Sequence, residues 1–445
     1  MIKVSVILPS LNVAKYVREC IESVINQTLR EIEIICVDAG SDDGTREILQ
    51  EYAQKDDRIL IIDSNIKSYG LQVNMGIKAA KGEYIAILET DDYVLNDMYE
   101  KLFNVAQKHK LDYVMADYMA FYDDIDGERK FFKVQNFSSV PELYHEVLSM
   151  EAHARLYSID DTTLWRGVFS RKFLLSNDIR LNETPGAAYQ DICFMHRVRM
   201  KVKRIMYINE FGYCYRTDRA ESSTNSIKGL QYAKYEYQYL LEQDCIPEIY
   251  KSKIYYTMSL SLVSESRNIL PRTGNVWCTA DLECYEWFRD ILLKAIKDGQ
   301  LVESMGGESW WKPLLVLLAS SEDFADRLKA VSDNLERIKR IASDAGFIII
   351  CGAGIRGQGL ARILKKEIIY GSKIDILYAD NDSKIWNSCI SGIKVLPIEL
   401  CVEQHPDAFF VIANKMHHMQ IRNQLLSKGI SEERIYEYRP TAKWK

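Results

Sequence analysis

The sequence predicts an α/β protein in which a mostly parallel sheet is followed by a helical region and by a second, smaller α/β unit. Short apolar segments alternate with amphipathic ones over the first 120 residues, and such alternation implies a parallel sheet with helices on both faces. The pattern becomes helical and rich in Tyr and Trp from about residue 228, and a new alternation begins at Phe347. We therefore divide the chain into 1–225, 226–345 and 346–445.

Apolar periodicity gives the expected elements of each part. Strands are expected at 3–8, 32–37, 59–62, 84–88, 113–115, 347–351, 374–378 and 408–412. Helices are expected at 14–27, 45–53, 72–80, 97–108 and 190–200. In open α/β sheets ligands gather at the carboxyl ends of the strands, so the residues that follow each strand are the ones to inspect.

Composition excludes several classes of protein. The chain has 445 residues, of which 47% are hydrophobic and 27% charged, and this is typical of a soluble globular protein with two or three domains. The formal net charge of -6 disfavours a nucleic-acid binder, which needs a concentrated basic surface.

The ten cysteines contain no C-x-x-C motif, and several stand inside apolar runs, so we expect free thiols in a reducing compartment. The amino terminus enters a strand without the pattern of a signal peptide, and the apolar run 314–319 is too short to cross a bilayer. These features favour a cytoplasmic location. Peripheral contact with the inner face of the membrane is left open.

The acids Asp91 and Asp92 directly follow the predicted buried strand 84–88. Adjacent carboxylates at such a place are unfavourable unless something neutralises them. A divalent cation does so, and Mg²⁺ and Mn²⁺ prefer hard oxygen ligands and often share them with substrate phosphates. The alternative is that one of the acids caps the next helix, although that helix is expected to begin nearer Asn96.

Six motifs together resemble the family 2 glycosyltransferases, which have the GT-A fold. They are VSVILPSLN at 4–12, CIESVINQT at 20–28, VDAGSDDGT at 37–45, NMG at 74–76, AKGEY at 80–84 and ETDD at 89–92. The resemblance covers roughly residues 1–225. It implies an inverting, metal-dependent transferase of the hexosyltransferase type that uses a nucleotide-sugar donor.

The resemblance also implies roles for single residues. Asp92 would bind the metal, and Asp91 would face the ribose or diphosphate of the donor. Pro9 and Asn12 would belong to the loop that encloses the nucleotide, and Asp38 would help to hold its base and ribose.

Two positions depart from the family pattern. Leu11 stands where the family often has an aromatic residue that stacks on the base, and Ala39 stands where it often has a second acid. Since both are aliphatic here, the sequence does not predict which base the donor carries.

The pair Gln190-Asp191 opens the helix predicted at 190–200, where the family has an acid pair. The resemblance implies that Asp191 is the general base. A carboxylate is suited to take the proton of an acceptor hydroxyl during an inverting transfer, while a metal stabilises the leaving diphosphate. The alternative is that Asp191 only caps the helix.

The segment Tyr213-Cys-Tyr215-Arg216, with Ser222 and Ser223, resembles the segment that closes the family's domain. The forked donors of Arg216 would suit a phosphate, and a structural salt bridge is the alternative. Trp165 matches an aromatic residue near the family's acceptor site, and a plain core tryptophan is the alternative.

In the last part Gly352, Gly354 and Gly357 follow a predicted strand and open a helix, and Asp380 ends the next strand. This is the context in which a dinucleotide fingerprint gains weight. The unit also resembles the small Rossmann-like modules attached to bacterial sugar transferases and sugar-modifying enzymes. We weigh an interaction module first, a nucleotide or nucleotide-sugar site second, and an oxidoreductase that uses NAD last.

The leading hypothesis is therefore a transferase that makes a bacterial surface polysaccharide or glycolipid on a saccharide or lipid-linked acceptor. The alternatives are a bifunctional enzyme whose last unit binds NAD or a nucleotide sugar, and a non-catalytic assembly protein. The sequence names neither the sugar nor the acceptor, and homo-oligomerisation is left open.

Overall fold

The computed structural model describes residues 1–123, 128–135, 137–138, 140–156, 162–219, 226–243, 245–274, 276–368 and 374–440. The chain forms two compact units. The first comprises Met1–Ile269 and Trp277–Leu314, and the second comprises Leu270–Val276 and Leu315–Lys445. In this division the helical region expected at 226–345 is shared between the two units.

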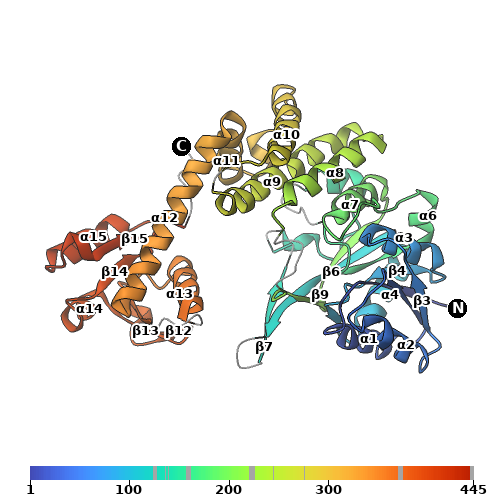
Figure 1. Cartoon of the computed structure of the whole chain (residues 1–445), viewed down its shortest axis with the longest axis horizontal. Coiled ribbons are helices and arrows are strands. Elements are labelled where there is room, and N and C mark those ends of the chain that lie inside the picture. Colours follow the sequence, from blue (N-terminus) through green and yellow to red (C-terminus); the bar gives the residue numbers. More distant parts are fainter. Residues whose placement is uncertain are drawn as a thin grey trace. The chain divides into compact units, whose positions relative to one another are not determined.

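The first unit combines a large sheet with helices (Figure 1). Within the described ranges it has eleven α-helices, of which α9 and α11 extend past its boundaries. Its strands are β1 (Val4–Ser10), β2 (Ile32–Asp38), β3 (Ile59–Asp63), β4 (Tyr84–Ile87), β5 (Tyr93–Val94), β6 (Tyr113–Asp123), β7 (Arg129–Val134), β8 (Gly167–Ser170) and β9 (Ile205–Arg216). Its helices are α1 (Val17–Ile25), α2 (Thr45–Ala53), α3 (Tyr69–Ala79), α4 (Met98–His109), α5 (Met150–Ala154), α6 (Arg171–Ser176), α7 (Gln190–Lys201), α8 (Gly229–Gln243), α9 (Glu248–Arg272), α10 (Thr279–Lys297) and α11 (Glu308–Ala319).

The sheet has the order β3-β2-β1-β4-β8-β6-β9-β5, and β7 pairs with β6. The first four strands of this order are parallel, as the alternating sequence predicts, and the α/β fold class is confirmed. Antiparallel β8 then joins β4 to β6, and β6 pairs with β9 in parallel. The short strand β5 pairs with β9, which carries the segment after β4 across to the end of β9.

Burial on both faces explains why the sequences of β1 and β2 are nearly continuous apolar runs. Every residue of both strands is buried, as is usual for parallel strands covered on both faces. Helix α3 packs against β1 and β2, and α4 packs against β6 and β8. The polar strand ends are left at one edge of this core.

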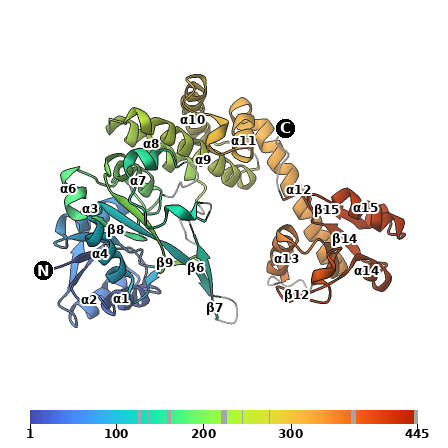
Figure 2. The ribbon, with the colours of Figure 1, turned by 180° about the vertical axis from the view of Figure 1, so that it is seen from behind.

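Helices α8, α9 and α10 form a helical layer beside α7, and α8 packs against both α7 and α10 (Figure 2). None of the helices in the described part of the chain has the length and apolar character that a bilayer crossing needs. All ten cysteines fall within the described ranges and are free, seven of them buried and three exposed.

The second unit is a smaller α/β layer structure. Its elements are α12 (Ser321–Ala345), β10 (Phe347–Cys351), α13 (Ile355–Ile368), β11 (Asp375–Asp380), β12 (Cys389–Ile390), β13 (Ile393–Pro397), α14 (Ile398–Gln404), β14 (Phe409–Ile412), α15 (His418–Ser427) and β15 (Ile435–Glu437). The sheet order is β12-β13-β11-β10-β14-β15. Ile348 and Ile350 face a core shared with α12 and α13, whereas Ile349 and Cys351 face a core shared with α14 and α15.

Candidate active site

A cavity of about 390 Å³ lies where the carboxyl end of β4 meets the start of α7. It is lined by Tyr69, Glu89, Asp91, Tyr118, Thr163, Leu164, Trp165, Ala187, Ala188, Tyr189, Gln190, Asp191, Tyr215 and Arg219. The sequence-predicted residues Asp91 and Asp191 therefore line one cavity, although a hundred residues separate them in the chain.

Asp92 is not among the residues that line this cavity, and it is only 2% exposed. Its Oδ2 accepts a hydrogen bond from the Tyr213 hydroxyl at 2.7 Å, and its Oδ1 accepts one from the Arg216 backbone N–H at 2.7 Å. Helix α4 begins at Met98, so Asp92 is not the cap of that helix. In this structure these two hydrogen bonds connect Asp92, in the segment after β4, to strand β9. The role of Asp92 as metal ligand stays a prediction.

The acids that face the cavity are crowded. Burial raises the pKa of Glu89 to about 8, and the negative charges of Asp91 and Asp191 add to the rise. The Tyr69 hydroxyl donates to Glu89 Oε1 at 2.5 Å, and Arg219 pairs with Asp91 Oδ2 at 2.9 Å. A cation in this cavity would relieve the repulsion that raises the pKa.

A divalent metal fits these acids if substrate phosphates supply part of its ligands. Within the described residues no group of three His, Cys, Asp or Glu side chains is arranged to hold a metal ion by itself. Mg²⁺ and Mn²⁺ sites of transferases need only one or two carboxylates, because substrate phosphates supply further oxygens. Asp91 is a carboxylate that faces the cavity, and its Oδ2 pairs with the guanidinium of Arg219.

Asp191 stands in the first turn of α7. The helix begins at Gln190 after Tyr189, which adopts a left-handed φ of 68°, and the Tyr189 side chain makes no capping hydrogen bond. Asp191 is therefore not the N-cap residue, and its half-buried side chain lines the cavity instead.

Gln190 explains why an amide replaces the first acid of the family pair. Its Oε1 accepts from the backbone N–H of Ala188 at 2.8 Å. Its Nε2 donates to the Thr184 hydroxyl at 3.0 Å and to the Gly186 carbonyl at 3.2 Å. An ionised carboxylate has no proton to donate, so it could not make the bond to the Gly186 carbonyl.

The predicted nucleotide loops lie beside the cavity but do not line it. Asp38 is 2% exposed, and its carboxylate accepts from the backbone N–H groups of Gly40 and Ser41 and from the Ser41 hydroxyl. The Asn12 side chain accepts from the Asp42 N–H at 3.0 Å, and the Pro9 carbonyl accepts from the Thr90 hydroxyl at 3.0 Å. These bonds shape the strand ends, and contact with a donor stays a prediction.

Arg216 is largely engaged by acids. Its guanidinium pairs with Asp123 at 3.0 Å and with Asp218 and Glu19 at 3.3 Å, and it lies over the ring of Tyr16. The salt-bridge alternative thus has observed partners. The serines 222 and 223 of the same motif lie outside the described residues.

Aromatic rings form one wall of the cavity. Trp165 is 8% exposed and stacks on Tyr215 with an interplanar angle of 3°, and Tyr118 meets it edge-on. Trp165 therefore belongs both to the hydrophobic core and to the cavity lining.

The second unit has a cavity of its own, of about 320 Å³, at the carboxyl ends of β10, β11 and β14. It is lined by Gly352, Asp380, Asn381, Asp382, Asn414, His417, Gln420 and Ile421. Asp380 accepts from the Ala353 N–H at 2.8 Å, and a Cβ on Gly357 would lie 1.9 Å from the Gly352 carbonyl oxygen. A Cβ on Gly354 would meet nothing within 4 Å, so only part of the glycine pattern is required by packing.

Comparison with known proteins identifies the first unit. The family model for glycosyl transferase family 2 matches residues 5–163. Glycosyltransferase GlyG of Streptococcus pneumoniae serotype 4 is 34% identical over 215 residues, which are 48% of this chain and 70% of that protein. The chain is a family 2 glycosyltransferase.

Two further comparisons describe the extent of the similarity. The poly(ribitol-phosphate) beta-glucosyltransferase of Bacillus spizizenii is 26% identical over 296 residues, which are 64% of this glycosyltransferase and 44% of that protein. The structure of S. aureus TarS 1-349 in complex with UDP-GlcNAc matches with a TM-score of 0.56 and 17% identity. That match covers 75% of this chain and 92% of TarS 1-349, and it supports the GT-A fold.

Several residues that line the cavity of this glycosyltransferase were not singled out from the sequence, among them Glu89, Tyr69 and Arg219. Glu89 precedes the acid pair and was treated only as part of its motif, Tyr69 lies outside every motif, and Arg219 lies just beyond the motif that ends at Arg216. A charged residue a few positions after a recognised motif is the signal that would have identified Arg219.

Proposed function

We propose that this glycosyltransferase moves a sugar from a nucleotide-sugar donor to a hydroxyl acceptor with inversion at the anomeric carbon, and that Asp191 is the general base. The observation that carries the proposal is that Asp91 and Asp191 line one cavity from separate segments. An inverting transfer needs a base for the acceptor and, elsewhere in the site, positive charge for the leaving group.

The proposed transfer is a single displacement at the anomeric carbon of the donor sugar. The acceptor oxygen forms a bond to the anomeric carbon while its proton passes to Asp191, and the bond from that carbon to the donor's phosphate oxygen breaks. The nucleoside diphosphate leaves with the electron pair. Arg219, which lines the cavity, supplies positive charge for it. A bound Mg²⁺ or Mn²⁺, held by Asp91 and the donor phosphates, would add Lewis-acid stabilisation of that charge.

The relatives support the class of substrate. TarS is known in complex with UDP-GlcNAc, and the B. spizizenii relative is a poly(ribitol-phosphate) beta-glucosyltransferase. By analogy we propose a nucleotide-sugar donor and a saccharide or lipid-linked acceptor in bacterial surface polysaccharide or glycolipid synthesis. Ten free cysteines favour a reducing compartment, so we propose that this synthesis takes place in the cytoplasm, at or near the inner face of the membrane.

A hydrolysis assay tests the reaction. The full chain is incubated with Mn²⁺ and a panel of UDP-glucose, UDP-galactose, UDP-N-acetylglucosamine and GDP-mannose, and nucleoside diphosphate release is measured. We expect Asp191→Asn to abolish release while calorimetry still detects binding of the same donor. Turnover retained in Asp191→Asn would remove Asp191 from its role, and no release from any donor in the wild-type chain would favour a non-catalytic protein.

A second function is proposed for the other unit, namely binding of a nucleotide in the cavity beside Gly352 and Asp380. The cavity of about 320 Å³ at the strand ends is the observation that favours it. Small-molecule sites span roughly 300–1,000 Å³, so the size suits a mononucleotide better than NAD.

Hydrogen exchange of the full chain with AMP, UDP and NAD tests whether this cavity binds a nucleotide. We expect protection of 352–358 by a mononucleotide, and no protection by any of them would leave an interaction module as the better interpretation.

A further inference from the structure

The segment from Leu181 to Tyr189 determines where Asp191 is placed. It contains no helix or regular strand, it leads directly into α7, and Ala187, Ala188 and Tyr189 line the cavity. A segment without its own ladder of hydrogen bonds keeps one conformation only if neighbouring elements hold it.

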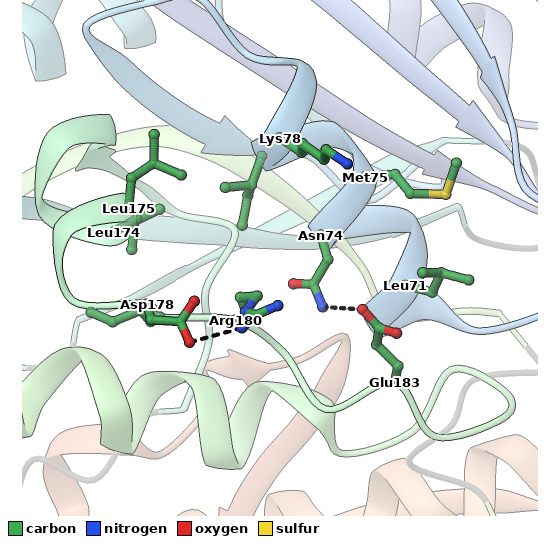
Figure 3. A pocket seen from close by; sticks show the side chains of 11 residues that line it. Leu71, Asn74, Met75, Lys78, Leu174, Leu175, Asp178, Arg180 and Glu183 are labelled. Atoms are coloured by element: carbon green, nitrogen blue, oxygen red, sulfur yellow. Dashed lines mark hydrogen bonds and ion pairs between the residues drawn. The ribbon is translucent and has the colours of Figure 1, made fainter. Parts of the chain in front are cut away.

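Helix α3 holds this segment from the side of the sheet. The Asn74 amide accepts from the Leu181 N–H at 3.0 Å and donates to the Leu181 carbonyl at 2.9 Å. It also donates to Glu183 at 3.0 Å, a contact drawn in Figure 3. A Cβ on Gly70 would lie 1.9 Å from the Asn182 carbonyl oxygen, so the segment packs directly on the α3 backbone.

The helical layer holds the same segment from a second side. The Asn182 side chain donates to Glu236 Oε1 of α8 at 3.0 Å, and the Tyr189 hydroxyl donates to Glu265 Oε1 of α9 at 2.7 Å. Glu236 is 1% exposed and Glu265 is 7% exposed. Burying two carboxyl groups is unfavourable unless hydrogen bonds compensate, so these contacts are not incidental surface pairs.

The backbone at Tyr189 shows what the second contact achieves. Tyr189 has a φ of 68°, a conformation that costs a non-glycine residue on the order of 1–3 kcal/mol and that persists only where the surroundings impose it. Gly229, the first residue of α8, leaves room for the contact, because a Cβ there would lie 1.9 Å from Glu265 Oε2 and 2.8 Å from the Tyr189 hydroxyl.

We propose that α8 and α9 are a positioning element of the active site, in which Glu236 and Glu265 hold the two ends of the segment 182–189 and thereby place Asp191. The inference rests on the proposed role of Asp191 as general base. Glu236 and Glu265 are positioning residues that act through Asn182 and Tyr189.

Hydrogen exchange of the unliganded full chain tests the proposal without any donor. Glu236→Ala and Glu265→Ala are expected to speed exchange of the amides in 182–191 at least tenfold. The matched control is Asp281→Ala, which removes another buried carboxylate of the same layer, one that binds Gln231 of α8 at 2.9 Å instead of a residue of the segment. Equal exchange in 182–191 for the three variants and the wild type would overturn the proposal.

Kinetics separate positioning from general stability. With the donor that the panel identifies, both alanine variants are expected to lower kcat about tenfold with unchanged KM, since small displacements of a reacting group have effects of this size or larger. Glu236→Gln, which keeps an oxygen that accepts from Asn182, is expected to restore kcat. Wild-type kcat in both alanine variants, with lowered thermal stability, would mean that the helices only support the fold.

Failure of the proposed function and failure of the positioning role give different results. If Asp191→Asn retains turnover, the proposed function fails whatever the helices do. If Asp191→Asn is inactive but the exchange and kcat of the alanine variants match Asp281→Ala, only the positioning role fails.

Discussion

The two units of this glycosyltransferase each carry a cavity at the carboxyl ends of parallel strands, but they hold their acids differently. In the first unit, Glu89, Asp91 and Asp191 face one cavity, and burial together with their mutual repulsion raises the pKa of Glu89 to about 8. In the second unit, Asp380 accepts from the N–H groups of Ala353 and Asp382 and so belongs to its own loop. Both cavities lie at strand ends, but in the first the acids also repel one another, and a perturbed carboxyl group in a cavity is a feature of functional sites.

The largest effect is expected from the acids of the first cavity. Asp91→Asn should lower kcat by roughly 10²-fold or more, because it removes the charge that faces the metal and diphosphate. The measurement is donor hydrolysis over a range of Mn²⁺ concentrations.

Asp92→Ala is the paired control, since Asp92 lies in the core beside Tyr213 and Arg216. It should lower the free energy of unfolding by about 1–3 kcal/mol, as measured by urea denaturation. Loss of Mn²⁺ dependence in Asp92→Ala with unchanged stability would instead support Asp92 as the metal ligand.

The two arginines near the first cavity are also expected to differ, one affecting catalysis and the other affecting stability. Arg219→Ala should lower kcat roughly 10- to 100-fold, because a charge-assisted contact to the leaving diphosphate is lost. Arg216→Ala should mainly destabilise the protein, because Asp123, Asp218 and Glu19 lose their shared partner. A greater loss of donor affinity in Arg216→Ala than in Arg219→Ala would reverse these roles.

A smaller effect is expected in the pH dependence of stability. Burial raises the pKa of Glu236 from 4.5 to about 8, and the negative charge of Asp191 on the facing helix adds to the rise. Protonated Glu236 therefore contributes fully to the free energy of unfolding below about pH 4.5. This contribution is lost as the pH rises through about 8 and the carboxyl group ionises. Glu236→Gln should be more stable than the wild type at pH 9 by a few kcal/mol at most, and equal to it near pH 4. Thermal unfolding at both pH values checks this, and a difference that does not change with pH would contradict it.

The smallest effect is expected in the second unit. Asp380→Asn should leave donor hydrolysis within about twofold of the wild type and should change the free energy of unfolding by about 1 kcal/mol or less, because one loop bond is weakened. Hydrolysis and thermal unfolding of the same preparation measure both. A large loss of hydrolysis would mean that the two units are coupled in function.

The parts of the fold that repeat a local pattern were predicted well. The strand at Phe347–Cys351 and the helix at Thr45–Ala53 were predicted with the bounds that the structure gives, because apolar periodicity decides them. The strand predicted at 113–115 instead continues to Asp123, because its pairing with β7 and β9 extends it beyond the apolar run.

The site was predicted in part. The family resemblance implied a role at the donor for Asp91 and a role as general base for Asp191, and both residues line one cavity in the structure, while their roles stay predictions. The inward turn of Asp92 could not be predicted, because it depends on the short strand β5 and its pairing with distant β9. Tyr69 was missed because it carries no periodic or motif signal, and Arg219 was missed because it lies beyond the segment that ends at Arg216.

The contacts of Glu236 and Glu265 have a practical consequence for choosing a catalytic fragment. The motifs recognised in the sequence end near residue 225, and a fragment cut there would lack both partners of the segment that leads to Asp191. The first compact unit extends to Leu314. A shortened enzyme intended for crystallisation or biocatalysis should therefore keep the chain at least through Ala319, where α11 ends, even though the residues after 225 carry none of the motifs by which the family is recognised.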